Sequence, residues 1–167
     1  MFDLKNTLKR VIVPISQDGY KIIIISFIIT FLVGTVSSCV GLIFFVLSLF
    51  CIYFFRNPDR VMPDDKKAII APADGTVDAI AKVNPPEELG LDSDKNWTRV
   101  SIFLSIFNVH VQRTPVAGTV TKMHYREGKF FNVSNDKYSK DNERQSCVIL
   151  TKDGVEIPVV QIAGLIA

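Results

Sequence analysis

We single out two side chains of this sequence, Asp74 and His110, as a candidate general acid or base. A carboxylate that is hydrogen-bonded to an imidazole fixes the tautomer of the ring and stabilises its cation, so an Asp–His pair could move protons at a reaction centre. Both residues also have an ordinary structural explanation. Asp74 lies in a turn of the type that favours Asp, and a histidine beside a core-facing strand is more often a hydrogen-bonded structural residue. The residue types alone leave both interpretations open.

Other reactive groups are few. His124 lies beside Tyr125 and Arg126 on an expected strand, where a structural role is the better interpretation. The cysteines, at positions 39, 51 and 147, suggest no disulfide framework, and no His or Cys cluster has the spacing of a metal site. Residues 56–167 hold 15 basic and 15 acidic side chains. A neutral domain of this kind disfavours nucleic acid as a partner.

From residue 22 to residue 55 the chain has 34 consecutive residues without Asp, Glu, Lys, Arg or His. A helix needs only about 20 apolar residues to cross a bilayer core, so the segment predicts membrane attachment and excludes a purely soluble protein. A cleavable signal peptide has a shorter apolar core, of about 7–15 residues. We therefore expect a retained membrane-anchoring segment, residues 1–55, followed by a polar domain, residues 56–167.

The middle of the apolar segment is rich in small and hydroxylated residues, and reads Val33-Gly34-Thr35-Val36-Ser37-Ser38-Cys39-Val40-Gly41. A straight helix of the whole segment would extend about 51 Å, well beyond the roughly 30 Å hydrocarbon layer. We therefore expect a bend here and a helical hairpin. Both flanks are basic, which places both ends and the polar domain on the cytoplasmic side of the cell membrane by the positive-inside rule. A single tilted membrane helix with its N-terminus outside is the alternative.

After residue 56, short β-type segments alternate with Pro, Gly and Asp, which predicts a mainly β domain of the α+β class. The expected strands are residues 68–71, 76–83, 99–111, 118–125, 146–151 and 155–166. Tight turns are expected at Asp74-Gly75 and at Lys152-Asp153-Gly154. Residues 84–96 and 128–144 are expected to be loops or a short helix. On this pattern His110 lies at the end of a strand, in phase with the core-facing Ile102.

Six motifs follow one another from the end of the apolar segment onward. They read Phe54-Phe55-Arg56-Asn57-Pro58-Asp59-Arg60, Ala71-Pro72-Ala73-Asp74-Gly75, Phe103-Leu104-Ser105-Ile106-Phe107-Asn108-Val109-His110-Val111-Gln112-Arg113, Pro115-Val116-Ala117-Gly118, Gly128-Lys129-Phe130 and Asp141-Asn142-Glu143-Arg144. In order and spacing they resemble the short form of the phosphatidylserine decarboxylase family, from about residue 54 to residue 167. The preceding apolar segment resembles that family in character.

The resemblance implies a proenzyme that cuts itself at a Gly-Ser bond into a large β chain and a small α chain, whose first residue becomes a pyruvoyl group. The group supplies the electron sink that amino-acid decarboxylation requires and that ordinary side chains lack. The resemblance implies Asp74 and His110 as catalytic residues. Longer relatives have a second histidine three residues after the first, where this sequence has Arg113, so the step that His110 serves stays open.

Lipid contacts are expected for four further residues, Arg56, Arg60, Asn108 and Arg113. Arginines next to a membrane segment also have a plainer role, since they often only meet anionic headgroups. The motif Asn142-Glu143-Arg144 either orders a loop over the site or forms a solvated charged turn, which is the slightly favoured interpretation. The expected partners are phosphatidylserine, the membrane and the small α chain, and a homo-oligomer is left open.

No Gly-Ser pair occurs in residues 1–167, so the serine that forms the pyruvoyl group would lie beyond Ala167. The chain is then either a part of the β chain or a truncated product. An inactive membrane-anchored β module, which binds lipid or acts as a scaffold, is the alternative function. A soluble Asp–His hydrolase is disfavoured because no Gly-x-Ser-x-Gly elbow is present.

We expect residues 1–55 to hold the protein in the membrane through buried apolar area rather than through charge. Salt screens attraction between charges but does not reverse the burial of the apolar segment. Membranes washed with high salt or alkaline carbonate and then sedimented should therefore keep the protein in the pellet. Release into the supernatant at high salt would show that the segment is not inserted.

Overall fold

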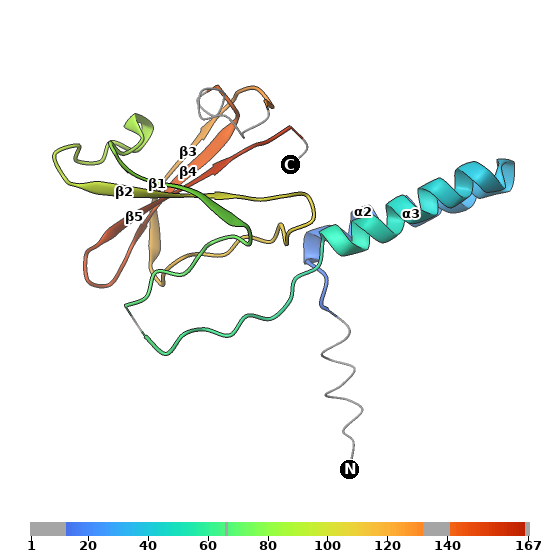
Figure 1. Cartoon of the computed structure of the whole chain (residues 1–167), viewed down its shortest axis with the longest axis horizontal. Coiled ribbons are helices and arrows are strands. Elements are labelled where there is room, and N and C mark those ends of the chain that lie inside the picture. The colour runs from blue at the N-terminus through green and yellow to red at the C-terminus, as the bar shows by residue number, and fades with distance from the viewer. Residues whose placement is uncertain (1–12, 66, 132–140, 166–167) are drawn as a thin grey trace, which may run out of the picture. The chain divides into compact units, whose positions relative to one another are not determined.

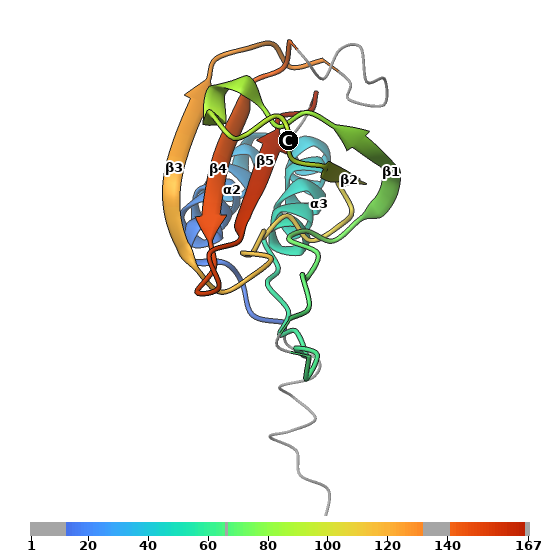
Figure 2. The ribbon, with the colours of Figure 1, turned by 90° about the vertical axis from the view of Figure 1, so that its left-hand side faces the viewer.

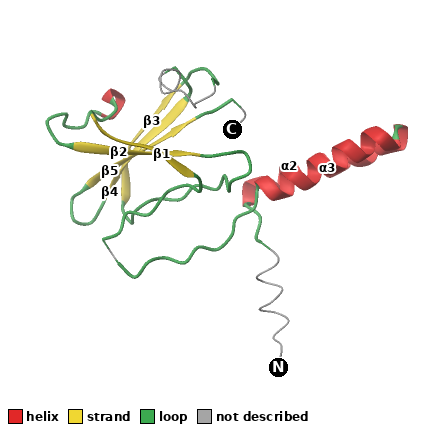
Figure 3. Cartoon of the chain, in the orientation of Figure 1, coloured by secondary structure: helices red, strands yellow, loops and turns green. Residues whose placement is uncertain are grey.

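The computed structural model describes residues 13–65, 67–131 and 141–165. The chain forms two compact units: unit 1 is Met1–Lys66 with Leu104–Gln112, and unit 2 is Lys67–Phe103 with Arg113–Ala167. The two long helices belong to unit 1, whereas the five strands and one short 3₁₀ turn belong to unit 2 (Figure 3). This composition confirms the expected class, a mainly β domain of the α+β type preceded by an apolar helical segment.

Unit 1 contains two apolar helices, α2 (Gln17–Val36) and α3 (Ser38–Phe54), which lie side by side as a hairpin (Figure 1). They are separated by Ser37, whose backbone is extended (φ −150°, ψ 116°). The break falls in the small and hydroxylated stretch, as expected. With 20 residues, α2 is about 30 Å long and matches a hydrocarbon layer. By length and composition α2 is able to cross a membrane, while α3 is shorter.

Small and hydroxylated residues line the contact between the two helices. Thr30 and Ser48 share a hydrogen bond of 2.9 Å between their hydroxyl groups, and Ser48 is buried. The lack of a side chain at Gly41 lets the backbones approach closely, because a Cβ on Gly41 would lie 2.7 Å from Gly34 Cα. In lipid, such close contacts and interhelical hydrogen bonds hold helices together, since lipid tails are as apolar as the helices themselves.

The two ends of the hairpin are joined by backbone hydrogen bonds. The amide of Ser16 donates to the carbonyl of Phe55 at 2.8 Å, and the amide of Asn57 donates to the carbonyl of Pro14 at 2.6 Å. The residues before α2 and after α3 therefore form a short antiparallel bridge. As a result the chain enters and leaves the hairpin at the same end.

Unit 2 contains two antiparallel sheets. Strand β1 (Thr76–Val83) pairs with β2 (Trp97–Phe103), and β4 (Arg144–Leu150) lies between β3 (Thr119–Arg126) and β5 (Glu156–Ile162) (Figure 2). The turn from β4 to β5 closes with the amide of Thr151 donating to the carbonyl of Val155 at 2.9 Å, and Gly154 takes the left-handed conformation at φ 78°. The expected hairpin at residues 152–154 is confirmed, as are the strands that correspond to β1, β3, β4 and β5.

The expected strand at residues 68–71 is wrong, and the turn at Asp74-Gly75 does not close a hairpin. These residues have no strand conformation, and the amide of Ile70 donates to the carbonyl of Pro115 at 2.9 Å. Gly75 instead packs against the backbone of Phe103, where a Cβ would collide with the carbonyl oxygen. The turn therefore leads the chain into β1 beside the end of β2. Strand β1 pairs with β2, which follows the loop at residues 84–96.

The expected strand at residues 99–111 ends early, at Phe103. Asn108 closes a tight turn there: its side-chain oxygen accepts from the amide of Ser105 at 2.8 Å, and its own amide donates to the carbonyl of Ser105 at 2.8 Å. Local hydrogen bonds of this kind compete with a strand ladder, which is why Asn favours turns. His110 is therefore not at a strand end in phase with Ile102.

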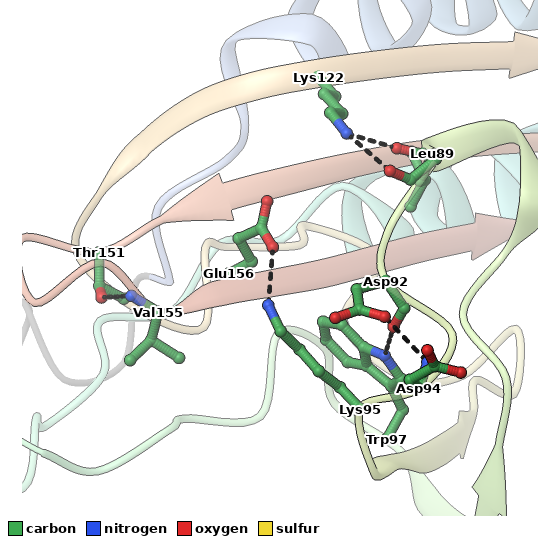
Figure 4. A network of polar contacts seen from close by, with 10 residues as sticks. Leu89, Asp92, Asp94, Lys95, Trp97, Lys122, Thr151, Val155 and Glu156 are labelled. Carbon is green, nitrogen blue, oxygen red and sulfur yellow. Dashed lines mark hydrogen bonds and ion pairs between the residues drawn. The ribbon is translucent and has the colours of Figure 1, made fainter.

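The loop at residues 84–96 contains a short 3₁₀ helix, η1 (Glu87–Leu89), as the sequence suggested. Leu89 and Leu91 form the small apolar core of unit 2 with Val148, and Trp97 packs against it. Polar contacts hold this loop to the sheets (Figure 4). Lys122 donates to the carbonyls of Leu89 at 2.8 Å and Gly90 at 3.2 Å, Trp97 donates to the carbonyl of Asp92 at 2.8 Å, and Lys95 pairs with Glu156 at 3.8 Å. Of the other expected loop, residues 132–140 lie outside the described residues.

Replacing Gly41 by Ala should loosen the hairpin, because the added methyl group meets the backbone of Gly34. Overpacking of this kind costs about 1–3 kcal/mol. Gly34→Ala is the matched control, since a Cβ at Gly34 has nothing within 4 Å and the gain in helix propensity is the same. Thermal unfolding in detergent should show a lower midpoint for Gly41→Ala alone. Equal midpoints for the two variants would contradict this account of the helix contact.

Candidate active site

The candidate site residues are divided between the two units. His110, Asn108, Arg56 and Arg60 belong to unit 1, together with the hairpin, whereas Asp74 and Arg113 belong to unit 2. Each group is described in its own unit.

Two contacts hold the imidazole of His110, a ring stack on one face and a hydrogen bond at one edge. Its ring stacks on the ring of Phe54, with 4.1 Å between the centroids and 23° between the planes. Its Nδ1 lies 3.1 Å from the carbonyl oxygen of Asn108. Because a carbonyl only accepts, this hydrogen bond requires a proton on Nδ1, which leaves Nε2 as the basic nitrogen of the neutral ring. His110 is half-buried, and the free lone pair of its neutral ring is on Nε2.

The backbone beside His110 is fixed by the end of α3. The carbonyl of Phe107 accepts one hydrogen bond from the Tyr53 hydroxyl at 3.0 Å and another from Arg56 Nη2 at 2.7 Å. Arg56 also donates from Nη1 to the carbonyl of Tyr53 at 2.7 Å, and its guanidinium lies 3.7 Å from the centre of the Tyr53 ring. Arg56 thus has a structural task in unit 1, and its contact with lipid phosphate stays a prediction.

Sequence reasoning missed the aromatic side chains that surround this loop. Phe50, Tyr53 and Phe54 follow the spacing i, i+3, i+4 and share one face of α3. Phe107 meets this face edge-on, with 6.2 Å between its centroid and that of Phe50. The spacing of the three helix residues was the available signal, but in an apolar helix it is typical of lipid-facing side chains as well.

In unit 2, Asp74 is half-buried in the turn that precedes β1. The backbone on either side of this turn is fixed. The amide of Arg113 donates to the carbonyl of Pro72 at 2.8 Å, and Gly75 packs against the end of β2. The Asp74 turn and the residue Arg113 therefore lie side by side within unit 2. The side chains of Arg113 in unit 2 and Arg60 in unit 1 are exposed, and their expected contacts with lipid stay predictions.

Asn142, from the last of the six motifs, Asp141-Asn142-Glu143-Arg144, is fully buried rather than solvated. Its side-chain oxygen accepts from the amide of Phe131 at 3.1 Å, and its side-chain nitrogen donates to the carbonyls of Phe131 and Ala163, both at 2.8 Å. The favoured interpretation of this motif as a solvated charged turn is therefore wrong for Asn142. The residue fastens the segment after β3 and the segment after β5 to the start of β4.

Arg144, from the same motif, lies in a largely buried polar cluster with Glu88 and Ser146. The Ser146 hydroxyl donates to Glu88 Oε1 at 3.0 Å, and Arg144 Nη1 lies 3.9 Å from the same oxygen. Burial alone would raise the pKa of Glu88, but hydrogen bonds from its backbone amide and Ser146, with the charge of Arg144, lower that pKa below its usual value. Glu88 is thus ionised at neutral pH, and the cluster is a structural ion pair.

Other reactive side chains have no visible catalytic arrangement. Burial raises the pKa of the Cys147 thiol, so little of the reactive thiolate forms at neutral pH. His124 is exposed on β3. Among residues 13–65, 67–131 and 141–165, no three His, Cys, Asp or Glu side chains are grouped as a metal site would require.

Comparison with known proteins gives consistent matches. A family model described as phosphatidylserine decarboxylase matches residues 47–167. The phosphatidylserine decarboxylase proenzymes of Rickettsia typhi and Rickettsia prowazekii are each 48% identical to the chain over 153 residues, and that of Rickettsia akari is 49% identical over 153 residues. Each match covers 92% of this chain and 66% of the relative. The chain therefore spans just under two thirds of the length of these relatives.

Replacing Asn142 by Ala should destabilise unit 2, because the variant removes the hydrogen bonds that the fully buried Asn142 side chain makes to the amide and carbonyl of Phe131 and to the carbonyl of Ala163. An unsatisfied buried polar group costs about 1–3 kcal/mol. Asn96→Ala is the control, since Asn96 is exposed in the loop between β1 and β2. Thermal unfolding followed by circular dichroism should show a clear drop for the first variant and little change for the second. A drop of similar size in both would argue against the buried role of Asn142.

Proposed function

The chain belongs to the phosphatidylserine decarboxylase family, and we propose that it forms the membrane-bound part of a self-cleaving enzyme that converts phosphatidylserine to phosphatidylethanolamine and CO2. The observation that carries this proposal is the family match, which includes every candidate residue from Arg56 to Arg113. A protein of this activity is a carboxy-lyase of phospholipid biosynthesis.

The chemistry requires an electron sink for the carbanion that remains when CO2 leaves, and a pyruvoyl group would supply it. No Gly-Ser pair occurs in residues 1–167, so we propose that the serine forming this group comes from beyond Ala167, on the small α chain. The residues present fit a role beside such a group. The hydrogen bond at Nδ1 of His110 leaves Nε2 without a proton in the neutral ring. A base that acts on a serine hydroxyl requires such a nitrogen.

We propose that His110 Nε2 takes the proton from that serine hydroxyl during self-cleavage and later exchanges a proton with the substrate. Asp74 is the proposed carboxylate partner, which stabilises the imidazolium cation once His110 is protonated. Arg56, Arg60, Asn108 and Arg113 are the proposed contacts for the lipid headgroup. Their charges and donor groups suit phosphate and carboxylate oxygens.

The hairpin supports the proposed location at the membrane. Its two ends are joined by the hydrogen bonds from Ser16 and Asn57, so both flanks of an inserted hairpin emerge on one side. Lys and Arg on both flanks favour the cytoplasmic side. We therefore propose that the site works at the cytoplasmic face, where the headgroup of a lipid substrate is within reach.

In the protein with its natural continuation beyond Ala167, expression should yield two chains, and His110→Ala or Asp74→Ala should leave one uncut chain. General acid–base catalysis contributes about 10²–10⁴-fold to a rate, so each variant should slow cleavage by at least about 100-fold. His124→Ala is the matched control, because His124 is the other histidine and lies exposed on β3. A denaturing gel over time measures cleavage, and CO2 release from phosphatidylserine vesicles measures activity.

Normal cleavage in both His110→Ala and Asp74→Ala would show that the two residues are structural. A protein that never forms two chains and releases no CO2 would instead favour the inactive lipid-binding module.

A further inference from the structure

We propose that Phe54 is a positioning residue, which holds the imidazole of His110 in the orientation that its proton transfers require. The inference depends on the proposed function, because it assigns Phe54 a part in the reaction of His110. It follows from a contact inside unit 1, the stack of the two rings with 4.1 Å between centroids and 23° between planes.

Two contacts of different kinds fix the direction of Nε2. A histidine side chain turns about two bonds, so one hydrogen bond still lets the ring swing about the bonded nitrogen. The bond from Nδ1 to the carbonyl of Asn108 sets the direction of one edge, and the Phe54 ring covers one face. Together they hold the ring plane and its edge, and therefore the line along which Nε2 accepts a proton. A small displacement of Nε2 from this line would lower the reaction rate, because a misplacement of about 1 Å can slow a reaction about 10²-fold.

Phe54 is itself well supported. It occupies the last residue of α3, and its ring packs edge-on against Phe55, with 5.2 Å between centroids and 74° between planes. Phe50, one helical turn earlier, lies 6.2 Å away. Aromatic pairs in such geometries gain about 0.5–1.5 kcal/mol beyond burial alone. The Phe54 ring is therefore held in place by its contacts with Phe50 and Phe55.

The backbone that carries His110 is fixed to the same helix end. Tyr53 and Arg56, which flank the Phe54-Phe55 pair, both donate to the carbonyl of Phe107. The Phe107 ring in turn packs edge-on against Phe50. The end of α3 and the loop that carries His110 are thus joined by hydrogen bonds and by ring contacts. A shift of α3 would therefore also shift His110.

Ordinary apolar packing is the competing explanation, and the choice of variants separates the two. Phe54→Leu keeps an apolar side chain but removes the flat ring, whereas Phe54→Tyr keeps the ring. In the protein with its natural continuation, Phe54→Leu should slow self-cleavage and lower kcat by about 10–100-fold, with little change in KM. Phe54→Tyr should stay within about twofold of the wild type by the same reasoning. Phe31→Leu, at an exposed aromatic residue of α2, is the control for loss of a ring in the hairpin.

A spectroscopic measurement reports the stack directly. Only two histidines occur in residues 1–167, so the imidazole signals of a protein labelled with ¹³C-histidine are assigned with His124→Gln. The ring current of Phe54 should shift the signals of His110 upfield in the wild type and in Phe54→Tyr, and Phe54→Leu should remove this shift. The exposed His124 provides the unshifted reference.

Three results would overturn the proposal. One is an unshifted His110 signal in the wild type, a test that holds even if Phe54→Leu fails to fold. A second is wild-type cleavage and kcat in Phe54→Leu while His110→Ala stays uncut, which would leave the proposed function standing and reduce Phe54 to packing. A third is an equal loss in Phe54→Leu and Phe54→Tyr. Normal cleavage in His110→Ala would instead contradict the proposed function itself.

Discussion

The carbonyl oxygen of Phe107 accepts hydrogen bonds from Tyr53 and Arg56 at once, and the arrangement of unit 1 depends on this double contact. Residues 104–112 form no strand or helix, and the turn that Asn108 closes is local, so contacts from outside the segment must fix its place. The contact at Phe107 ties them to the end of α3 and brings His110 onto Phe54. The last turn of the apolar helix α3 therefore supports the loop that carries His110.

Buried polar groups as well as apolar side chains hold unit 2 together. Its apolar core is small, formed by Leu89, Leu91 and Val148 with Trp97 beside them. Asn142 and the cluster of Glu88 with Ser146 add hydrogen bonds between segments that are distant in the sequence. Apolar contacts tolerate small shifts, whereas buried polar groups must meet particular partners. The polar motifs thus define the positions of the loops that lead into and out of the central strand β4.

The strands β4 and β5 were predictable from the sequence, because short β-type segments on both sides of a Gly-containing turn are a local feature. The wrong strand at residues 68–71 and the early end of the strand expected at residues 99–111 are explained by contacts that a local pattern does not contain. Residues 68–71 contact Pro115, and Asn108 folds the chain after Phe103. Asp74 and His110 were singled out by residue type and by their motifs, and their catalytic role stays a prediction. Phe54 was missed because an aromatic ring at the end of an apolar helix has the same pattern whether it meets lipid or an imidazole.

The joined ends of the hairpin have a consequence for the order of biosynthesis. All residues of the bridge have been made once Asn57 emerges from the ribosome, whereas residues 104–112 follow about 50 residues later, several seconds at a rate of about 5–20 residues per second. During this interval the aromatic end of α3 has been made, but residues 104–112, which contact it, have not. In a hairpin that inserts into a bilayer, rings such as Tyr53 are stable at the lipid–water boundary. Residues 104–112 then meet an end of α3 whose residues have already been made.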